Sequence, residues 1–303
     1  MDTGILLESG TNELEILEFT IGNNHYGINV AKVKEILPYT LPTPIPNANV
    51  CVEGIFMPRD TIISIVNLAK ALGLPDSNDQ SKDMYILTNF NKLNAAFHVH
   101  TVVGIHRVSW EAIIKPDATI SSAGSGVATG IIKLEDKLII ILDFEKIITD
   151  INPETGLKVS DISHLMDRKR NDTPILIAED SGLLSKLITE CLHKAGYSNI
   201  INTSNGREAY DKLLEYKASG NLDEKVRCVI TDIEMPQMDG HHLTKLIKED
   251  SVLQKIPVII FSSLITEEMK RKGNLLGADM QMSKPEIGSL VEAIDKLIGV
   301  KKI

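Results

Sequence analysis

The chain has 303 residues, of which 43% are hydrophobic and 24% are charged, as in globular proteins of about two domains. Its net charge of −9 disfavours broad nucleic-acid binding and adhesion to anionic membranes, because both require clustered Lys and Arg. Its three cysteines show no CxxC spacing, and no apolar run approaches the ~20 residues of a membrane span. We therefore expect a cytoplasmic protein with no nucleic-acid partner and no direct membrane insertion.

The first half of the chain contains short apolar segments separated by Gly, Pro or Asn, a pattern typical of strands and turns. The segments expected to be strands are residues 14–21, 26–29, 62–66, 84–89, 95–99 and 138–143. Residues 41–46 can form neither a central strand nor a helix, because alternate Pro residues lack amide donors. No long helix is evident, so residues 12–150 are predicted to form an all-β barrel or sandwich.

Residues 151–172 are polar and charged, and we expect them to be a linker. From Thr173 onward, short apolar strands alternate with helices. The strands are expected at 175–179, 200–201, 227–231, 258–261 and 278–282, and the helices at 181–195, 207–216, 241–248, 267–276 and 286–298. This alternation indicates a parallel sheet covered on both faces. Residues 173–303 are therefore predicted to form a flavodoxin-like α/β domain with strand order 2-1-3-4-5, so the protein is multidomain.

Polar side chains follow four of the expected strands. Glu179 and Asp180 follow the first strand, Asp232 the third, Ser262 ends the fourth and Lys284 follows the fifth. Ligands of open α/β sheets bind at this edge, so we expect the side chains to converge. Clustered carboxylates require a cation, and a few hard oxygen ligands together with a phosphate suit Mg²⁺. A carboxylate can also attack a phosphoryl group, so the sequence predicts a Mg²⁺-dependent phosphoryl-transfer site.

The motifs that contain these residues resemble those of response-regulator receiver domains. The matching stretches are residues 175–181, 232–240, 257–263 and 284–285. The resemblance implies that Asp232 accepts a phosphoryl group from a histidine kinase. It also implies that Asp180 and Asp232 bind Mg²⁺ directly, that Glu179 binds it mainly through water, and that Glu234 offers its backbone carbonyl. The alternative is a receiver that has lost phosphorylation, in which the acids are only solvated strand ends.

The same resemblance implies that Ser262 and Lys284 contact the phosphoryl oxygens and that the bond between Lys284 and Pro285 is cis. One position departs from the family pattern. Receivers usually carry Tyr or Phe at the switch position occupied here by Gln281, and that aromatic ring swings inward on phosphorylation. A Gln side chain cannot act as a buried aromatic piston. The phosphorylation chemistry is therefore expected to be retained without the usual readout, and Asp239-Gly240 is expected to serve as a turn.

No comparable group of residues occurs in the first half. His98 and His100 would share one face of a strand and could bind a metal, but two half-exposed strand histidines are the expected case. His241 and His242 diverge on a helix, and Trp110 is expected to be a packing anchor. Without a nucleotide cradle or a catalytic triad, we expect surface recognition and no enzymatic activity.

Several motifs of the first half resemble CheW-type coupling domains, namely residues 17–22, 27–30, 33–36, 54–59 and 62–68. Residues 105–111, 129–132 and 142–147 resemble more specifically CheV proteins, in which a CheW-like domain precedes a receiver. The resemblance implies a pair of five-stranded SH3-like barrels that share a core. It also implies a scaffold that holds methyl-accepting chemoreceptors against the histidine kinase CheA.

By position, Val33 and Glu35 match receptor-contacting residues of coupling domains, and Arg59 matches the signature arginine. The alternative for Arg59 is an intramolecular salt bridge. Asp60 occupies a position where Gly is usual, and Asp tolerates left-handed backbone better than most residues. We therefore expect the turn to be retained.

Two functions fit this combination of domains. The first is a coupling adaptor at membrane-associated chemoreceptor arrays that is regulated by phosphorylation of Asp232. The second is a phosphate sink that drains phosphoryl groups from the kinase. A receiver-driven enzyme or DNA-binding regulator would carry an effector segment after the receiver, and the expected last helix is followed only by residues 299–303.

Overall fold

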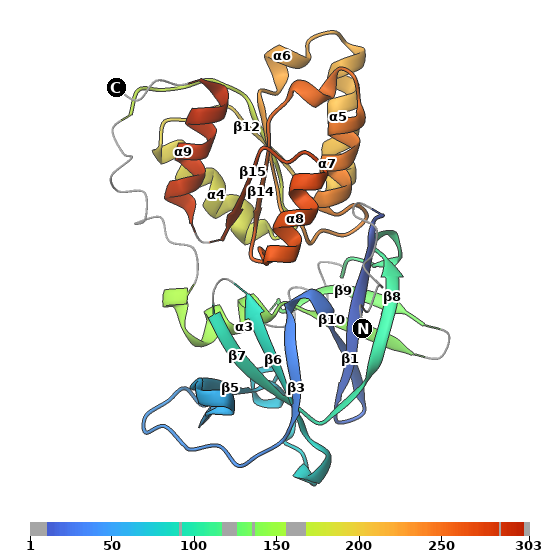
Figure 1. Ribbon diagram of the computed structural model, residues 1–303, viewed down its shortest axis with the longest axis vertical. Helices are drawn as coiled ribbons and strands as arrows, with labels where there is room; N and C mark the ends of the chain where they lie inside the picture. The colour runs from blue at the N-terminus through green and yellow to red at the C-terminus, as the bar shows by residue number, and fades with distance from the viewer. Residues whose placement is uncertain are drawn as a thin grey trace. The chain divides into compact units, whose positions relative to one another are not determined.

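The computed structural model describes residues 11–90, 93–116, 126–134, 137–155, 168–284 and 286–299. The chain divides into two compact units (Figure 1). The β unit is Leu14–Gly156, and the α/β unit is Met1–Glu13 together with Leu157–Ile303. Most of the predicted linker, residues 156–167, lies outside the described residues, as does Pro285 with its expected cis bond.

The β unit is built from two five-stranded sheets. The first consists of β1 (Glu13–Ile21), β2 (Asn24–Asn29), β8 (Thr101–Ser109), β9 (Ala128–Lys133) and β10 (Leu138–Leu142), in the order β8-β1-β2-β10-β9. The second consists of β3 (Val33–Pro38), β4 (Val52–Phe56), β5 (Ile63–Asn67), β6 (Met84–Phe90) and β7 (Leu93–Val99), in the order β3-β6-β7-β5-β4. The pairs β10 with β2 and β5 with β7 are parallel, whereas β1 with β2, β10 with β9, β3 with β6, β4 with β5 and β6 with β7 are antiparallel.

Three apolar clusters hold the β unit together. One contains Trp110 and belongs to the first sheet, and another contains Tyr85 and belongs to the second. The third joins residues of both sheets, with Phe97 of β7 packed edge-on against Phe144 at a centroid distance of 4.5 Å. Such an edge-to-face pair stabilises a core beyond its buried area. The expected pair of five-stranded barrels with a shared core is therefore confirmed, and Trp110 is a core residue.

Helices are short in the described part of the β unit. They are α1 (Leu68–Ala71) and α3 (Phe144–Ile151), and Asp143 caps α3 by accepting from Lys146 N. Within residues 41–46, the only paired position is Thr43, which bridges Ile55. At Gly54, φ is 150° and an added Cβ would lie 2.2 Å from Thr43 O, so this close approach requires glycine.

The α/β unit contains a parallel sheet of β11 (Ile175–Ala178), β12 (Ile200–Thr203), β13 (Cys228–Thr231), β14 (Val258–Ser262) and β15 (Met280–Ser283). The strand order β12-β11-β13-β14-β15 is the predicted order 2-1-3-4-5. Every residue of β11, β13 and β14 is buried, as expected for strands that are covered on both faces.

The surrounding helices are α4 (Gly182–Lys194), α5 (Gly206–Ala218), α6 (Leu222–Lys225), α7 (Gly240–Glu249), α8 (Glu267–Leu275) and α9 (Ile287–Ile298). Ile175 and Ile177 belong to the apolar cluster of α4 and α9, whereas Leu176 and Ala178 belong to that of α5 and α7. The alternation along β11 thus places helices on both faces of the sheet (Figure 1). Helix α8 contributes only Gly273 to the buried residues.

The C-terminal end of the predicted linker, residues 168–172, packs on the α/β unit. Arg168 donates to both carboxylate oxygens of Asp295 on α9 at 2.7 Å, and the Tyr197 hydroxyl donates to the same carboxylate at 2.5 Å. Asn171 forms a parallel bridge with Tyr197. Residues 168–172 are therefore anchored to this unit ahead of its first strand.

Candidate functional site

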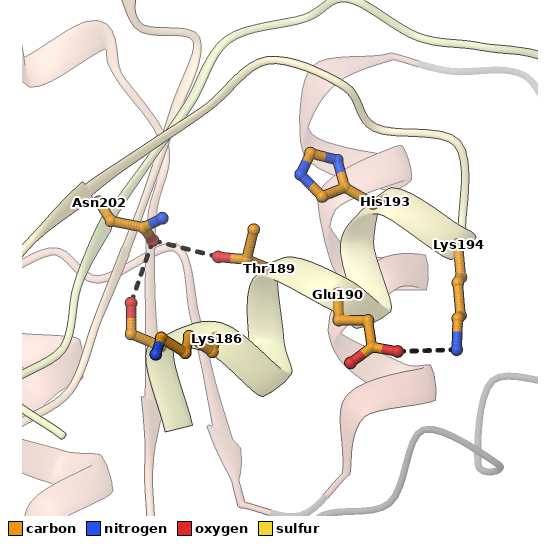
Figure 2. A pocket seen from close by; sticks show the side chains of 7 residues that line it. Lys186, Thr189, Glu190, His193, Lys194 and Asn202 are labelled. Atoms are coloured by element: carbon orange, nitrogen blue, oxygen red, sulfur yellow. Dashed lines mark hydrogen bonds and ion pairs between the residues drawn. The ribbon is translucent and has the colours of Figure 1, made fainter. Parts of the chain in front are cut away.

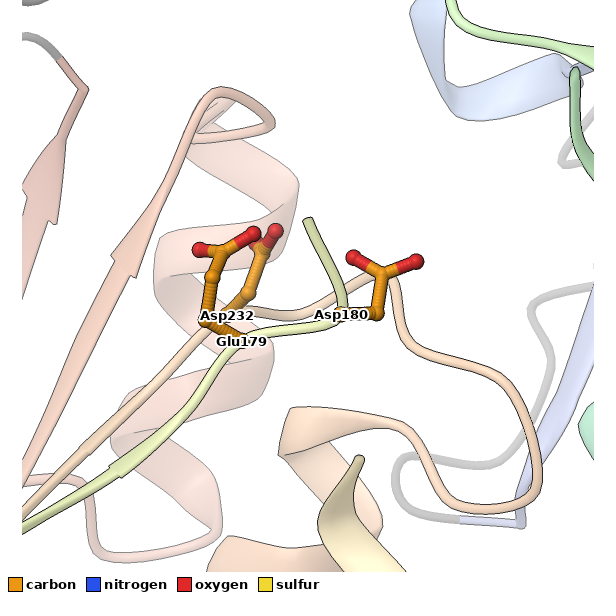
Figure 3. Close-up of side chains that lie close together, drawn as sticks. All are labelled: Glu179, Asp180 and Asp232. Atoms are coloured by element: carbon orange, nitrogen blue, oxygen red, sulfur yellow. The ribbon is translucent and has the colours of Figure 1, made fainter. Parts of the chain in front are cut away.

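Three carboxylates meet at the carboxyl edge of the parallel sheet. Glu179 and Asp180 follow β11, and Asp232 follows the neighbouring strand β13. The register pairs Ala178 with Thr231, so Glu179 and Asp232 leave the sheet at the same level. One oxygen of each carboxylate lies within 4.8 Å of the others (Figure 3). Among the residues that the structure describes, this is the only group of three or more such side chains close enough to hold a metal ion.

Lys284 supplies the cation of this edge. Its Nζ donates to Glu179 Oε2 at 2.7 Å and to Asp232 Oδ2 at 2.8 Å. Burial raises the pKa of Glu179 above its ordinary value, while the charge of Lys284 acts in the opposite direction. The site therefore contains three carboxyl groups and one ammonium group, so it is negatively charged when all three carboxyl groups are ionised.

The loop after Asp232 is folded tightly onto that residue. Ile233 N donates to Asp232 Oδ1 at 2.6 Å, and Gly240 N donates to Ile233 O at 2.9 Å. A Cβ atom at Gly240 would lie 1.9 Å from Asp232 O, so only glycine fits. The expected turn at Asp239-Gly240 is instead the start of α7, because Asp239 caps this helix by accepting from His242 N at 2.8 Å and Gly240 is its first residue. Asp232 retains 8% exposure at the strand end.

Asn12 is a residue of this site that the sequence patterns did not indicate. It belongs to the α/β unit and is buried, and its side chain bonds to the loop that follows Asp232. Asn12 Nδ2 donates to Gln237 O at 2.9 Å, and its Oδ1 accepts from Asp239 N at 3.0 Å. A lone Asn ahead of a strand gives no sequence signal for a partner more than 220 residues away.

The remaining predicted receiver residues lie on the expected elements. Ser262 ends β14, is fully buried and pairs in register with Ser283, which precedes Lys284. Its hydroxyl accepts from Leu264 N at 3.3 Å and makes no hydrogen bond to Asp232 in the described structure. Glu234 is half-buried in the loop after Asp232. The structure thus brings Glu179, Asp180, Asp232 and Lys284 together, with Ser262 on the adjacent strand end.

In the β unit, Arg59 Nη2 donates to Glu35 Oε1 at 2.6 Å, so the intramolecular salt bridge is present. The Arg59 side chain is nevertheless 81% exposed. Arg59 and Asp60 both have left-handed backbone, with φ of 51° and 65°, so the expected turn is formed without glycine. Val33, the third candidate, is half-buried at the start of β3.

Of the two histidines, His98 differs from expectation, whereas His100 is half-buried as expected and lies just after β7. His98 is buried, not half-exposed, with Nδ1 2.8 Å from Glu53 Oε1 and Nε2 2.9 Å from Asp83 Oδ2. Burial lowers the pKa of His98, but these carboxylates outweigh burial and raise it overall. His100 Nδ1 accepts from Gly22 N at 2.8 Å. Each histidine thus has its own structural partners.

A second buried ionic cluster surrounds Glu18, which is fully buried on β1. Its carboxylate lies 2.6 Å from His25 Nδ1, 2.5 Å from His106 Nε2 and 2.5 Å from Lys137 Nζ. Burial alone would raise the pKa of Glu18, but these three donors lower it overall. The cluster is a satisfied ion network of the first sheet.

A groove of about 480 Å³ lies on α4 and β12 (Figure 2) and shares no residue with the acidic edge. It is lined by Ser185, Lys186, Thr189, Glu190, His193, Lys194 and Asn202. Most of these groups bond to one another, with Ser185 and Thr189 donating to Asn202 Oδ1 at 3.2 Å each. Lys194 pairs with Glu190 at 2.8 Å, so the groove offers little free chemistry.

Comparison with known proteins gives a match for each unit. Residues 15–152 match the CheW-like domain, and residues 175–295 match the response regulator receiver domain. The chain is 30% identical over 300 residues to the chemotaxis protein CheV3 of Helicobacter pylori, covering 95% of each chain. It is 30% identical over 152 residues to the chemotaxis protein CheW of Thermotoga maritima, covering 50% of this chain and 98% of that one.

Among solved structures, the scaffolding protein TtCheW of Thermoanaerobacter tengcongensis is 24% identical, covering 43% of this chain and 89% of that one, with a TM-score of 0.41. The two domain matches and the similarity to CheV3 define a chemotaxis coupling adaptor in which a CheW-like domain precedes a receiver. The chain belongs to the CheV family of chemotaxis proteins. No helix in the described ranges is long and apolar enough to span a membrane.

Proposed function

We propose that this adaptor couples methyl-accepting chemoreceptors to the histidine kinase CheA at membrane-associated receptor arrays in the cytoplasm, and that phosphorylation of Asp232 regulates it. The observation that carries the proposal is the convergence of Asp232 with Glu179, Asp180 and Lys284. The matches to chemotaxis proteins CheV3 and CheW support the partners. The protein acts by binding and by accepting a phosphoryl group, and it has no enzymatic substrate of its own.

In the transfer step, a carboxylate oxygen of Asp232 forms a bond to phosphorus as the bond between phosphorus and the donor imidazole nitrogen breaks. The imidazole leaves with the electron pair of that bond and takes up a proton. Lys284, which neutralises Asp232 Oδ2 beforehand, becomes available to the phosphoryl oxygens once the acyl phosphate forms. Ser262, on the adjacent strand end, is the proposed hydroxyl donor to a second phosphoryl oxygen.

The donor set of the acidic edge fits Mg²⁺. Asp180 and Asp232 would hold the ion directly and Glu234 through its backbone carbonyl, because a few hard oxygen ligands suit this metal. Glu179 is already bonded to Lys284, which fits binding through water. When bound, Mg²⁺ would neutralise charge on the phosphoryl oxygens.

In the CheW-like domain we propose that Val33, Glu35 and Arg59 contact partner proteins. The exposed guanidinium of Arg59 is held by one carboxylate of its own chain, Glu35. Exposed ion pairs of this kind are worth little, so a partner carboxylate can replace Glu35 at low cost.

The test is transfer of radiolabelled phosphate from phosphorylated CheA in the presence of Mg²⁺. The wild type and an Asp211→Asn control, changed at an exposed position of α5, should become labelled, whereas Asp232→Asn should not. Equal labelling of Asp232→Asn would overturn the proposal. Kinase activity of receptor arrays then separates regulation from a phosphate sink: without competing acceptors, a sink alone predicts no difference between the wild type and Asp232→Asn.

A further inference from the structure

Helix α8 is held to the α/β unit by an unusually small apolar contact. Gly273 is the only buried residue of its nine, and Leu275 is 82% exposed. Helix α9, by contrast, buries Ile287, Leu290, Val291, Ala293, Ile294 and Asp295. Helices in proteins are normally stabilised by packing of an apolar face, so α8 must be positioned by other contacts.

Gln281 of β15 provides such a contact. Its Nε2 donates to Lys270 O at 2.8 Å and to Asn274 Oδ1 at 2.9 Å, and both acceptors belong to α8. A Cβ atom at position 273 would lie only 2.3 Å from Gln281 Oε1. Gly273 therefore leaves the space in which the carboxamide lies against the helix.

The polar contacts around α8 are incompletely satisfied. Gln281 Oε1 is buried without a hydrogen-bond partner in the described structure, and so is Nε2 of His241 on α7. Burial lowers the pKa of His241 to about 4, with a smaller contribution from Lys272 of α8. Among the described residues, four buried side-chain atoms have no partner, and two of these atoms belong to residues beside this one helix. An unsatisfied buried polar atom is unfavourable, so these two atoms weaken the attachment of α8 to the rest of the unit.

The contact joins β15 to the helix that follows β14, and both strands lead to residues of the phosphorylation site, β14 to Ser262 and β15 to Lys284. Gln281 pairs in register with Ile260, two residues before Ser262 on β14, and it precedes Lys284 by three residues on β15. The segment that leaves Ser262 reaches the cap of α8, Thr266, after three residues. A shift of Ser262 toward a phosphoryl group would therefore move α8 relative to β15, and a hydrogen bond weakens steeply when its geometry is lost.

We propose that Gln281 is a polar latch that fixes α8 through Lys270 O and Asn274 while Asp232 is unmodified, and that phosphorylation opens this latch. The inference rests on the proposed phosphorylation of Asp232. The Gln281 carboxamide would take the role of the missing aromatic ring, and it would release α8 by losing its two hydrogen bonds to this helix. The released α8 would expose polar backbone and the Gly273 face to a partner.

Hydrogen exchange of the α8 amides in the full chain tests the latch, with Mg²⁺ and beryllium trifluoride as the phosphoryl mimic. In the wild type, the mimic should accelerate exchange of residues 267–275 by about 10-fold, since each lost hydrogen bond contributes modestly to opening. Gln281→Met keeps the side-chain length and removes the donor. It should exchange about 10-fold faster without the mimic and show no further increase with it.

Asn274→Ala removes one acceptor and should give an intermediate rate, whereas Gln254→Met, at an exposed position away from α8, should match the wild type. Exchange of Gln281→Met at the wild-type rate would overturn the latch. If Gln281→Met exchanges fast but the phosphoryl mimic does not accelerate exchange in the wild type, phosphorylation does not open the latch. This conclusion holds provided that Asp232 accepts label from CheA. If Asp232 accepts no label, the failure lies in the proposed function instead.

Discussion

The ammonium group of Lys284 lies 2.8 Å from Asp232 Oδ2, and both side chains are almost entirely buried. The same ammonium group also neutralises Glu179, 2.7 Å away. The Lys284 ammonium group therefore stabilises the unphosphorylated site and is also placed to contact a phosphoryl group on Asp232. The stability of the domain and its chemistry are consequently linked at this residue.

Replacing Lys284 with Met should lower the free energy of unfolding by about 3 kcal/mol in Mg²⁺-free buffer, because buried carboxylates lose their cation. Adding Mg²⁺ should restore part of this stability, since an ion bound to the native state offsets the same charges. Urea denaturation with and without Mg²⁺ measures both effects. Lys186→Met, at an exposed position of α4, should change stability by less than about 0.5 kcal/mol. Equal urea midpoints for Lys284→Met and the wild type would contradict this account.

Asp180→Asn should weaken Mg²⁺ binding by at least about 10-fold, because it removes one charged ligand from a site with few ligands. Isothermal titration calorimetry with Mg²⁺ measures the dissociation constant directly. Asp211→Asn, which changes the net charge equally at an exposed position, serves as the matched control. An unchanged affinity in Asp180→Asn would remove Asp180 from the metal site.

Gly240→Ala should lower the free energy of unfolding by about 3 kcal/mol or more, because its methyl group would overlap the carbonyl of Asp232. It should also abolish labelling by phosphorylated CheA, since the backbone of the acceptor must shift. Gly182→Ala is the matched control: nothing lies within 4 Å of its added Cβ, and it should be neutral or stabilising by about 0.5 kcal/mol. Guanidinium denaturation of both variants decides the comparison, and similar midpoints would contradict the steric argument.

His98 should make stability depend on pH. Its pKa is raised above 6.5 in the folded chain by Glu53 and Asp83, despite the opposing effect of burial. The protonated form is therefore favoured by folding, so the stabilisation is fully present below pH 6.5 and is lost as pH rises through the folded-state pKa. The stability difference between the wild type and His98→Gln should accordingly shrink from about pH 6 to about pH 9. A stability difference between the wild type and His98→Gln that stays constant over this pH range would rule His98 out.

The sequence was sufficient for the receiver fold and for most of its acidic edge. Parallel strands place their carboxyl ends together, so the positions of Glu179, Asp180, Asp232 and Lys284 after apolar runs already predict that they meet. The strand order followed from the same alternation of strands and helices. The predicted helix boundaries lie within two residues of the observed ones, but they shift in both directions. Ser181 is the cap of α4 and not its first residue, whereas α7 begins at Gly240, one residue before its predicted start and directly after its cap.

Contacts between distant segments could not be predicted in this way. His98 was expected to be half-exposed because strand alternation usually leaves one face to solvent. β7, however, is a central strand, paired with β6 and β5, and its last five residues are all buried. Glu18 belongs to no motif, and the receiver pattern indicated Gln281 only as the position where an aromatic residue is missing. Their partners lie on other elements, and only the folded chain brings them together.

Because Gly273 is the only buried residue of α8, natural variation can alter the exposed positions of this helix other than Asn274, the acceptor for Gln281, without disturbing the core. The exposed side chains of α8 can thus change along with those of a binding partner. Positions 273 and 281 cannot vary independently, because any side chain at position 273 would displace the carboxamide of Gln281. Across lineages, loss of the glycine should therefore accompany replacement of the glutamine, so that the two positions are inherited as a pair.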